Sequence, residues 1–191
     1  MTYEEFYGDQ YCRLQKAETI LKNLIMKFQK NTDEKKIAYV SSRIKSPESM
    51  QKKLEKKGVE PTSENAVSKV NDAVGARVIC SFIDDIYKVS DWLKEQDQIE
   101  VVKIKDYIAY PKKNGYRSYH MIIKIKDLNL NAEIQIRTIA LDFWANLEHQ
   151  MKYKRDIKNE EMIRSELKRC ADEIASVDLS MQTIKDLIFM N

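Results

Sequence analysis

The chain has 191 residues, of which 43% are hydrophobic and 33% are charged, and its formal net charge is +3. This length suits one ordinary domain with a helical extension, and the composition excludes an intrinsically disordered chain. So small a net charge does not by itself indicate a nucleic-acid-binding protein, and no apolar run approaches the roughly 20 residues that a membrane-spanning helix needs.

The first predicted elements are two helices. Across residues 3–30, small and apolar side chains recur three or four positions apart, which predicts an amphipathic helix with the buried stripe Leu14, Ala17, Leu21, Leu24, Ile25 and Phe28. After a polar break, a second helix is expected to begin at Ser46-Pro47-Glu48 and to stop at Gly58. Its many lysines form either a solvated face or a cluster that offsets the charge of a polyphosphate.

Residues 72–154 predict an α/β unit. Short apolar runs rich in β-branched residues predict buried or half-buried strands at 74–82, 99–108, 119–126 and 131–138. Helices are expected at 84–96 and at about 139–154. This order predicts a mixed β-sheet flanked by helices.

The last stretch of the chain has the most regular pattern. Apolar residues alternate four and three positions apart over more than three heptads, at Ile163, Leu167, Cys170, Ile174, Val177, Met181, Ile184 and Ile188. Such a seam predicts a coiled coil and self-association. The alternative is that this helix packs back on its own domain.

The three cysteines, Cys12, Cys80 and Cys170, are far apart and lack metal-ligand spacing. Cys80 lies in the apolar run 74–82 and is expected to be a buried small hydrophobe. Because the N-terminus also shows no export signal, we expect a protein of the reducing cytoplasm.

Residues 131–138 alternate strictly between apolar and polar side chains. Ile134 and Ile136 point to one face of the predicted strand, and Glu133, Gln135 and Arg137 point to the other. A half-buried strand with a hydrated outer face explains this pattern, and so does the polar floor of a binding site.

The entrance of the first predicted strand carries Asp72, and Gly75 and Arg77 follow it. Asp72 either caps a turn or binds a hard divalent cation, which takes one or two carboxylates together with phosphate oxygens. Gly75 inside a buried strand indicates close approach by another group. Arg77 needs an anion, an aromatic ring or a base to lie against it.

Residues 110–120, YPKKNGYRSYH, join two predicted strands through an Asn-Gly turn. The segment is either an exposed basic hairpin or a nucleotide site, because it combines cations for phosphate with aromatic rings for a base. Tyr116 and His120 lie on one face of the strand, which favours a joint role.

Five segments, taken together and in this order, resemble the synthetase domain of the RelA/SpoT family, most closely its single-domain branch, the small alarmone synthetases. They are SRIKSPESMQKKLEKKG, NDAVGARVICSFIDDI, KDYIAYPKKNGYRSYH, AEIQIRT and FWANLEHQMKYK, and they cover roughly residues 40–155. The resemblance implies a nucleotidyltransferase-like α/β domain with N- and C-terminal helical extensions. We therefore expect a helical segment at 1–38, the synthetase domain at 39–156 and an oligomerisation helix at 157–191.

The resemblance also implies roles for particular residues. Asp72 corresponds to the magnesium-binding aspartate of the family's D-x-x-G-x-R pattern, and Glu133 to a glutamate that acts as general base toward the acceptor's 3′-hydroxyl and helps to hold the metal. Tyr116 corresponds to the tyrosine that stacks on guanine, and Arg43 and Arg77 to two arginines that sandwich adenine. The other matched positions are ATP contacts at Lys45, Ser46, Lys53 and Lys56, and guanosine nucleotide contacts at Lys105, Lys112, Asn114, His120 and Gln135.

Two positions depart from the family pattern. Ser42 stands where the family often has glycine before its R-x-K stretch. Lys105 stands where relatives often have arginine, and a lysine cannot bind phosphate in a bidentate manner. Neither departure concerns Asp72 or Glu133, but the acceptor preference is left open.

The implied activity is a magnesium-dependent transfer of pyrophosphate from ATP to the 3′-hydroxyl of GTP, GDP or GMP, which yields AMP and the (p)ppGpp alarmones of the stringent response. Larger relatives also carry a hydrolase built around a His-Asp pair. His120 and His149 are followed here by Met121 and Gln150, so we expect no hydrolase activity. The family further implies a homotetramer formed through terminal helices, with a regulatory alarmone or single-stranded RNA as additional candidate partners and no membrane.

Two other functions are compatible with the same residues. A toxic relative that pyrophosphorylates the 3′ end of tRNA needs a basic surface beyond the pocket, for which KYKRDIK at 152–158 is a candidate. A non-catalytic nucleotide- or RNA-binding regulator on the same scaffold is expected to have lost one of the two acids. Both Asp72 and Glu133 are present.

Overall fold

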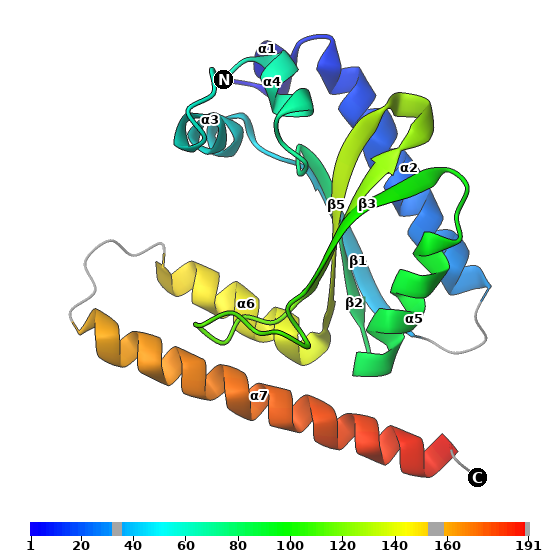
Figure 1. Ribbon diagram of the computed structural model, residues 1–191, viewed down its shortest axis with the longest axis vertical. Helices are drawn as coiled ribbons and strands as arrows, with labels where there is room; N and C mark the ends of the chain where they lie inside the picture. Colours follow the sequence, from blue (N-terminus) through cyan, green and yellow to red (C-terminus); the bar gives the residue numbers. More distant parts are fainter. Residues whose placement is uncertain (32–35, 153–158, 190–191) are drawn as a thin grey trace.

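The computed structural model describes residues 1–31, 36–152 and 159–189. Within these residues, five strands form one sheet with the order β1-β2-β5-β4-β3 (Figure 1). The β2–β5 pair is parallel and the other neighbouring pairs are antiparallel, which confirms the predicted mixed sheet. The strands are β1 (Ile37–Ile44), β2 (Val74–Cys80), β3 (Ile99–Asp106), β4 (Tyr119–Ile125) and β5 (Leu130–Thr138).

Two helices, α2 (Gln10–Lys30) and α5 (Ile83–Lys94), cover the same face of the sheet (Figure 1). All six residues of the predicted stripe on α2 are buried. Beneath the two helices, alternate strand residues form the main core, among them Val74, Ala76, Val78, Met121, Ile123, Ile134 and Ile136. Because strand side chains alternate between faces, the intervening polar residues lie on the opposite face.

The register of the strands gathers those polar residues into a row. Gln135 of β5 pairs with Arg77 of β2 on one side and with His120 of β4 on the other. Glu133 pairs with Gly75 in the same parallel ladder. This polar face of the sheet is the one on the side of α3 (Pro47–Lys56) and α6 (Ile139–Lys152), which stand at opposite ends of it (Figure 1).

Helix α3 begins and ends where the sequence predicts. The Ser46 hydroxyl accepts a hydrogen bond from the Ser49 amide, and Pro47 occupies the first turn. Past the end of the helix, Gly58 has a φ of +67°, a conformation that glycine adopts without steric cost. The short helices α1 (Tyr3–Tyr7) and α4 (Ser63–Ser68) lie near α3, and a 3₁₀ turn, η1 (Lys126–Leu128), joins β4 to β5.

The final helix, α7 (Glu160–Phe189), runs alongside α6 and continues past it (Figure 1). In its first half, Leu167, Cys170 and Ile174 pack against Trp144 of α6. In its second half, the inner face is polar instead: Asp178 accepts a hydrogen bond of 2.5 Å from Thr138, and Lys185 contacts two aspartates at the start of α5.

The predicted seam is therefore divided between two environments. Its first four residues, Ile163, Leu167, Cys170 and Ile174, are half-buried on the protein's own domain. Its last four residues, Val177, Met181, Ile184 and Ile188, are exposed, as are Leu179, Leu187 and Phe189. The alternative that the helix packs back on its own domain thus describes the whole helix on its inner face, which is apolar in the first half and polar in the second. The second half of the seam instead belongs to an exposed, apolar outer face.

Three elements differ from the sequence prediction. The predicted helix over residues 3–30 is interrupted at Gly8, where φ is +51°, so that it becomes α1 and α2. Strand β1 was not predicted, because it is an edge strand that pairs only with β2 and polar residues interrupt its apolar pattern. Helix α4 was also not predicted, since it is only 6 residues long and is defined by the Thr62 cap rather than by an apolar stripe.

No helix in the described parts of the chain is both long enough and apolar enough to cross a membrane. Cys80 is buried as predicted, and burial raises the pKa of its thiol above the ordinary value. Cys170 is half-buried on α7, and Cys12 is exposed on α2.

Candidate active site

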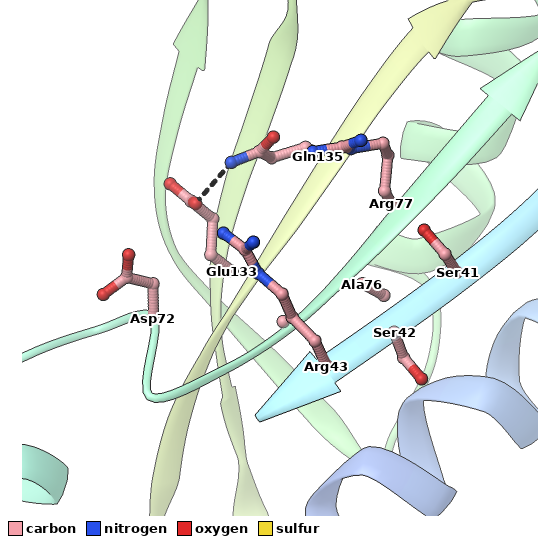
Figure 2. A pocket seen from close by; sticks show the side chains of 9 residues that line it. Ser41, Ser42, Arg43, Asp72, Ala76, Arg77, Glu133 and Gln135 are labelled. Carbon is pink, nitrogen blue, oxygen red and sulfur yellow. Dashed lines mark hydrogen bonds between the residues drawn. The ribbon is translucent and has the colours of Figure 1, made fainter. Parts of the chain in front are cut away.

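A cavity of about 200 Å³ lies on the polar face of the sheet, over β1, β2 and β5 (Figure 2). It is formed by residues from three segments that are far apart in the sequence, and five of these residues are among the predicted site residues. The lining residues are Ser41, Ser42, Arg43, Asp72, Gly75, Ala76, Arg77, Glu133 and Gln135.

Asp72 lies in the loop that leads into β2, and one of its carboxylate oxygens is held by two lysines. Oδ2 is 2.7 Å from Nζ of Lys53 on α3 and 3.1 Å from Nζ of Lys45. The Lys45 backbone amide also donates to the Ala73 carbonyl at 2.8 Å, so the chain after β1 is fastened beside the aspartate. Three predicted residues, Lys45, Lys53 and Asp72, are thereby brought together.

The other carboxylate oxygen of Asp72 is buried without a partner in the described parts of the chain. Oδ1 is buried and has no hydrogen-bond partner among the described residues, a situation that costs free energy unless another group binds it. Figure 2 shows Asp72 and Glu133 on the same side of the sheet, where both line the cavity.

The described residues contain no group of three His, Cys, Asp or Glu side chains that could hold a metal by itself. A hard divalent cation does not need such a group, because it accepts one or two carboxylates and completes its shell with water and phosphate oxygens. The carboxylates of Asp72 and Glu133 therefore fit a cation that is bound jointly by the protein and a polyphosphate.

Both oxygens of Glu133 are hydrogen-bonded within the polar row. Oε1 is 3.1 Å from Nδ1 of His120, and Oε2 accepts a hydrogen bond of 2.8 Å from the Gln135 amide, drawn as the dashed line in Figure 2. Burial raises the pKa of the Glu133 carboxyl, but the bonds from His120 and Gln135, with the charge of Lys53, outweigh burial and lower it to about 2. Glu133 is consequently ionised at neutral pH.

Beside Glu133, an aromatic group surrounds Tyr116. The Tyr116 hydroxyl is 2.9 Å from Nε2 of His120, and Tyr107 meets both rings edge to face. The Lys112 ammonium lies 4.6 Å from the ring centroids of Tyr107 and Tyr116. A flat ring next to a cation is the arrangement expected for a nucleotide site. The geometry therefore favours the nucleotide interpretation of residues 110–120 over that of an exposed basic hairpin.

The loop between β3 and β4, residues 107–118, is held against α7. Gly115 has a φ of +85°, and a Cβ atom there would lie 2.6 Å from Cβ of Ala171. Arg117 donates to the Ala171 carbonyl at 3.3 Å and to the Asp172 carboxylate at 3.1 Å. Asn114 donates to Glu148 of α6 at 3.1 Å. The predicted turn is therefore present and is packed against two helices.

Two residues connect the two sides of the site: Arg137, which the strand pattern offers only as part of a polar floor, and Asp142, for which no role was predicted. Nη1 of Arg137 donates to Asp142 of α6 at 2.9 Å, and Nη1 of Arg77 lies 3.5 Å from the same carboxylate oxygen. Tyr39 of β1 donates to the other oxygen at 2.5 Å. Strand alternation places Arg137 on the polar face, but nothing in the sequence distinguishes Asp142 from an ordinary acid in the first turn of a helix.

The cations at the cavity form one cluster. Burial lowers the pKa of Arg77, and the nearby charges of Arg137 and Arg43 lower it further, while Asp142 opposes them. With Lys45 and Lys53 bonded to Asp72, the cavity places several positive charges around two carboxylates. Such a site suits a ligand with concentrated negative charge.

Gly75 and Ser46, two residues singled out from the sequence, have structural roles here. A Cβ atom at Gly75 would lie 2.9 Å from the Glu133 carbonyl oxygen, so the close approach predicted from the glycine is that of the neighbouring strand. The Ser46 hydroxyl caps α3. Lys56 is exposed near the end of the same helix and does not line the cavity.

The two departures from the family pattern lie on different faces. The Ser42 hydroxyl donates to Glu18 of α2 at 2.6 Å, so its side chain is engaged on the covered face. Lys105 of β3 pairs with His120 in the ladder and is half-buried next to the aromatic group. The basic stretch 152–158 lies, except for its first residue, outside the described residues.

Comparisons with known proteins agree with one another. A family described as a region found in RelA/SpoT proteins matches residues 42–158. The GTP pyrophosphokinase YwaC of Bacillus subtilis is 46% identical over 156 residues, which cover 78% of this chain and 74% of that protein.

Solved structures extend this similarity to the whole chain. The small alarmone synthetase 2 of B. subtilis has a TM-score of 0.79 at 37% identity, covering 94% of this chain and 98% of that one. The small alarmone synthetase 1 of B. subtilis, bound to its product pppGpp, has a TM-score of 0.81 at 28% identity and covers 98% of both chains.

Proposed function

Because the chain belongs to the RelA/SpoT family, we propose that it is a small alarmone synthetase, which transfers the pyrophosphate of ATP to the 3′-hydroxyl of GTP, GDP or GMP. One observation carries this proposal: Asp72 and Glu133 line a single cavity between a cluster of cations and an aromatic group. A polyphosphate donor and a nucleoside acceptor need these two surroundings, and the transfer takes place where they meet.

On the donor side, Lys45 and Lys53 would hold the phosphates of ATP, because their ammonium groups already surround Asp72. Arg43 and Arg77 line the same cavity from neighbouring strands and would lie against adenine. A guanidinium plane stacks on a base more readily than a lysine does. Ser46 and Lys56, which the resemblance also assigns to ATP, belong to this proposal as contacts that form at α3.

On the acceptor side, the ring of Tyr116 would stack on guanine, with Lys112, Asn114 and His120 nearby. Lys105 and Gln135 complete the set of acceptor contacts that the resemblance implies. Stacking tolerates either face of the ring, and hydrogen bonds from Asn114 and Gln135 would add the preference for guanine.

In the proposed step, Glu133 accepts the proton of the 3′-hydroxyl while that oxygen attacks the β-phosphorus of ATP. The bond from the β-phosphorus to the bridging oxygen of the α-phosphate breaks, and AMP leaves with that oxygen. Glu133 is ionised at neutral pH and is therefore ready to accept a proton.

Magnesium is the cation that we propose for this site, held by Asp72, Glu133 and phosphate oxygens. When bound, it supplies charge neutralisation at the transferred group. The orphaned Oδ1 of Asp72 supports this assignment, because a hard cation satisfies an oxygen that no described side chain reaches.

Product analysis tests the proposed function. The protein is incubated with ATP and magnesium together with GTP, GDP or GMP, and the nucleotides are separated by chromatography. AMP and the corresponding alarmone are expected in equal amounts, and neither without an acceptor or after magnesium is chelated. If no AMP is released with GTP, with GDP or with GMP, the proposed function is wrong.

The same experiment separates the rival functions. Deacylated tRNA as the acceptor, with labelled ATP, would become labelled at its 3′ end if the protein were the toxic relative. A protein that binds guanosine nucleotides without releasing AMP would be a non-catalytic regulator. We favour the alarmone synthetase because both Asp72 and Glu133 line the cavity.

We further propose that the chain forms a homo-oligomer through α7, with a tetramer as the expected state. The second half of α7 turns Asp178 and Lys185 toward its own domain and leaves Val177, Met181 and Ile184 exposed. An apolar outer face of this kind is typical of an interface between protein subunits. Light scattering at micromolar concentration tests this, and a monomeric mass would contradict it.

The remaining expectations belong to the same proposal. They are a cytoplasmic location, the division into parts at 1–38, 39–156 and 157–191, and regulation by an alarmone or single-stranded RNA. The free state of Cys12, Cys80 and Cys170 supports the location.

A further inference from the structure

The side chains around Glu133 form a closed ring of hydrogen bonds. One arm runs from Glu133 to Nδ1 of His120 (3.1 Å) and from Nε2 of His120 to the Tyr116 hydroxyl (2.9 Å). The other arm runs from Glu133 to the amide nitrogen of Gln135 (2.8 Å). Both arms end on one atom, Nη2 of Arg137, which is 2.8 Å from the Tyr116 oxygen and 2.9 Å from Oε1 of Gln135.

The direction of each bond follows from which groups can donate. Arg137 has no acceptor atom, so it donates to both Tyr116 and Gln135. Ionised Glu133 has no donor, so it accepts from both His120 and Gln135. In the neutral imidazole, Nδ1 then carries the hydrogen, and Nε2 accepts the hydrogen of the Tyr116 hydroxyl. Both arms therefore donate in one direction, from Arg137 to Glu133.

The remaining nitrogens of Arg137 are fixed as well. Nη1 donates to Asp142 at 2.9 Å and Nε donates to Ser118 at 3.2 Å. Arg137 is only 4% exposed and Asp142 only 2%. The guanidinium thus has its plane and its rotation set by the end of β5 and the start of α6, and it contacts Glu133 only through other side chains.

We propose that Arg137 is a positioning residue for the transfer reaction, because it holds the two side chains that orient the Glu133 carboxylate and links them to the ring of Tyr116. This inference rests on the proposed function, in which Glu133 is the base and Tyr116 the guanine platform. It adds that the platform and the base are parts of one hydrogen-bonded unit.

The alternative is that Arg137 serves only to pair with the buried charge of Asp142. In that role, removing Arg137 destabilises the fold because it leaves Asp142 as an unpaired buried charge, and it has no particular effect on the geometry at Glu133. The two roles are separated by a substitution that opens the ring but leaves the Arg137–Asp142 pair in place. Tyr116→Phe is such a substitution, because it removes one hydroxyl and keeps the aromatic ring.

Steady-state kinetics with ATP and GTP at saturating magnesium are the first measurement. Tyr116→Phe is expected to lower kcat by about 10- to 100-fold, the effect of one hydrogen bond to a charged network, and to change the KM for GTP by no more than about threefold. Arg137→Gln is expected to lower kcat at least as much. Arg137→Lys is not expected to restore kcat, since an ammonium has three donors and cannot make the four bonds of Arg137 to Tyr116, Gln135, Asp142 and Ser118.

Two matched controls distinguish positioning from general destabilisation. Tyr119→Phe removes a hydroxyl that bonds Ser90 on the covered face, so it lowers stability without opening the ring. Arg169→Gln removes an arginine that is exposed on α7 and pairs only with surface glutamates in the described structure. Both controls are expected to keep kcat within about twofold of the wild type.

A spectroscopic measurement follows the ring without catalysis. The chain has two histidines, and His149 is exposed on α6, so the nitrogen signals of His120 can be assigned against an internal reference. In the wild type, Nδ1 of His120 is expected to be protonated and Nε2 to accept a hydrogen bond. Tyr116→Phe is expected to shift the Nε2 signal of His120 and to leave that of His149 unchanged.

The outcomes separate this inference from the proposed function. An unchanged kcat in Tyr116→Phe, or a reduced kcat with an unchanged His120 spectrum, overturns the positioning role. A wild type that releases no AMP overturns the proposed function, and the role for Arg137 in that reaction with it, while the His120 spectrum still decides whether the ring exists.

Discussion

The two faces of the sheet are built from the same strands and differ in almost every other respect. On the face under α2 and α5, residues such as Val78, Ile134 and Ile136 are fully buried and carry no hydrogen-bonding groups in their side chains. On the opposite face, Glu133, Gln135 and Arg137 alternate with them along the same strand and are bonded to one another through His120 and Tyr116.

Because of this difference, a substitution on the covered face should mainly change stability, and a substitution on the polar face should mainly change activity. A side chain on the covered face contributes through the area that it removes from water, which does not depend on its neighbours' charges. A side chain on the polar face contributes through directed bonds, each of which needs a particular partner. Neighbouring residues on β5 should therefore respond to substitution in opposite ways.

The strongest test of the comparison is Glu133→Gln. This change keeps the size of the side chain and removes the charge and the proton acceptor, so synthesis should fall by about 10²- to 10⁴-fold. Binding of ATP, followed by calorimetry, should stay within about threefold. Glu100→Gln on the exposed side of β3 is the matched control, and substantial turnover by Glu133→Gln would remove Glu133 from the role of base.

The next residue along β5 gives the opposite expectation. Ile134 is fully buried, so Ile134→Ala should lower the free energy of unfolding by about 2–5 kcal/mol. Its kcat, measured well below the unfolding temperature, should stay within about threefold of the wild type. Ile104→Ala, on the exposed edge strand β3, should cost less than about 1 kcal/mol. Equal stability losses in the two variants would contradict the comparison.

A smaller effect is expected at the platform on the polar face. Tyr116→Ala should weaken binding of the guanosine nucleotide by about 1–3 kcal/mol, the range for loss of a base–aromatic stack, and should leave the KM for ATP nearly unchanged. Tyr110→Ala changes an exposed tyrosine of the same loop and serves as the control. An equal rise of both KM values in Tyr116→Ala would mean that the ring supports the site as a whole rather than the acceptor alone.

The smallest effect concerns the polar contact between β5 and α7. Burial raises the pKa of Asp178, and the hydrogen bond from Thr138 lowers it only in part. Because the pKa of Asp178 is higher in the folded state, the protonated carboxyl favours folding. Its contribution to the free energy of unfolding is fully present below about pH 4, the pKa in the unfolded state, and is lost as the pH rises through the folded pKa. Denaturant titrations should show that Asp178→Asn gains stability relative to the wild type across this rise. Parallel pH profiles of the two proteins would contradict it.

Much of this arrangement could be predicted from the sequence, because strand alternation is a local property. The pattern of residues 131–138 alone places Glu133, Gln135 and Arg137 on one face, and the stripe Leu14 to Phe28 identifies the buried side of α2. The position of Asp72 and Glu133 in one cavity is not a local property, and the sequence indicates it only through resemblance to a family.

What the sequence could not indicate depends on how separate elements meet. Strand β1 has a short apolar pattern and pairs with only one strand, so Tyr39 was not recognised as a partner of Asp142. The bond between Arg137 and Asp142 depends on the angle at which α6 leaves β5, which no residue pattern encodes. The seam in α7 was visible, but its division between a part packed on α6 and a part that is exposed follows from the position of α6.

The contact between Gly115 and Ala171 has a consequence for how such proteins diverge. A single methyl group already fills the space between the 107–118 loop and α7, so a side chain at 115 or a larger one at 171 would push the two apart. The positive φ of Gly115 adds a second constraint, because any other residue there is strained whatever the space. Across relatives that share this helix, position 115 should therefore stay glycine and position 171 should stay small, even where the surrounding surface has drifted.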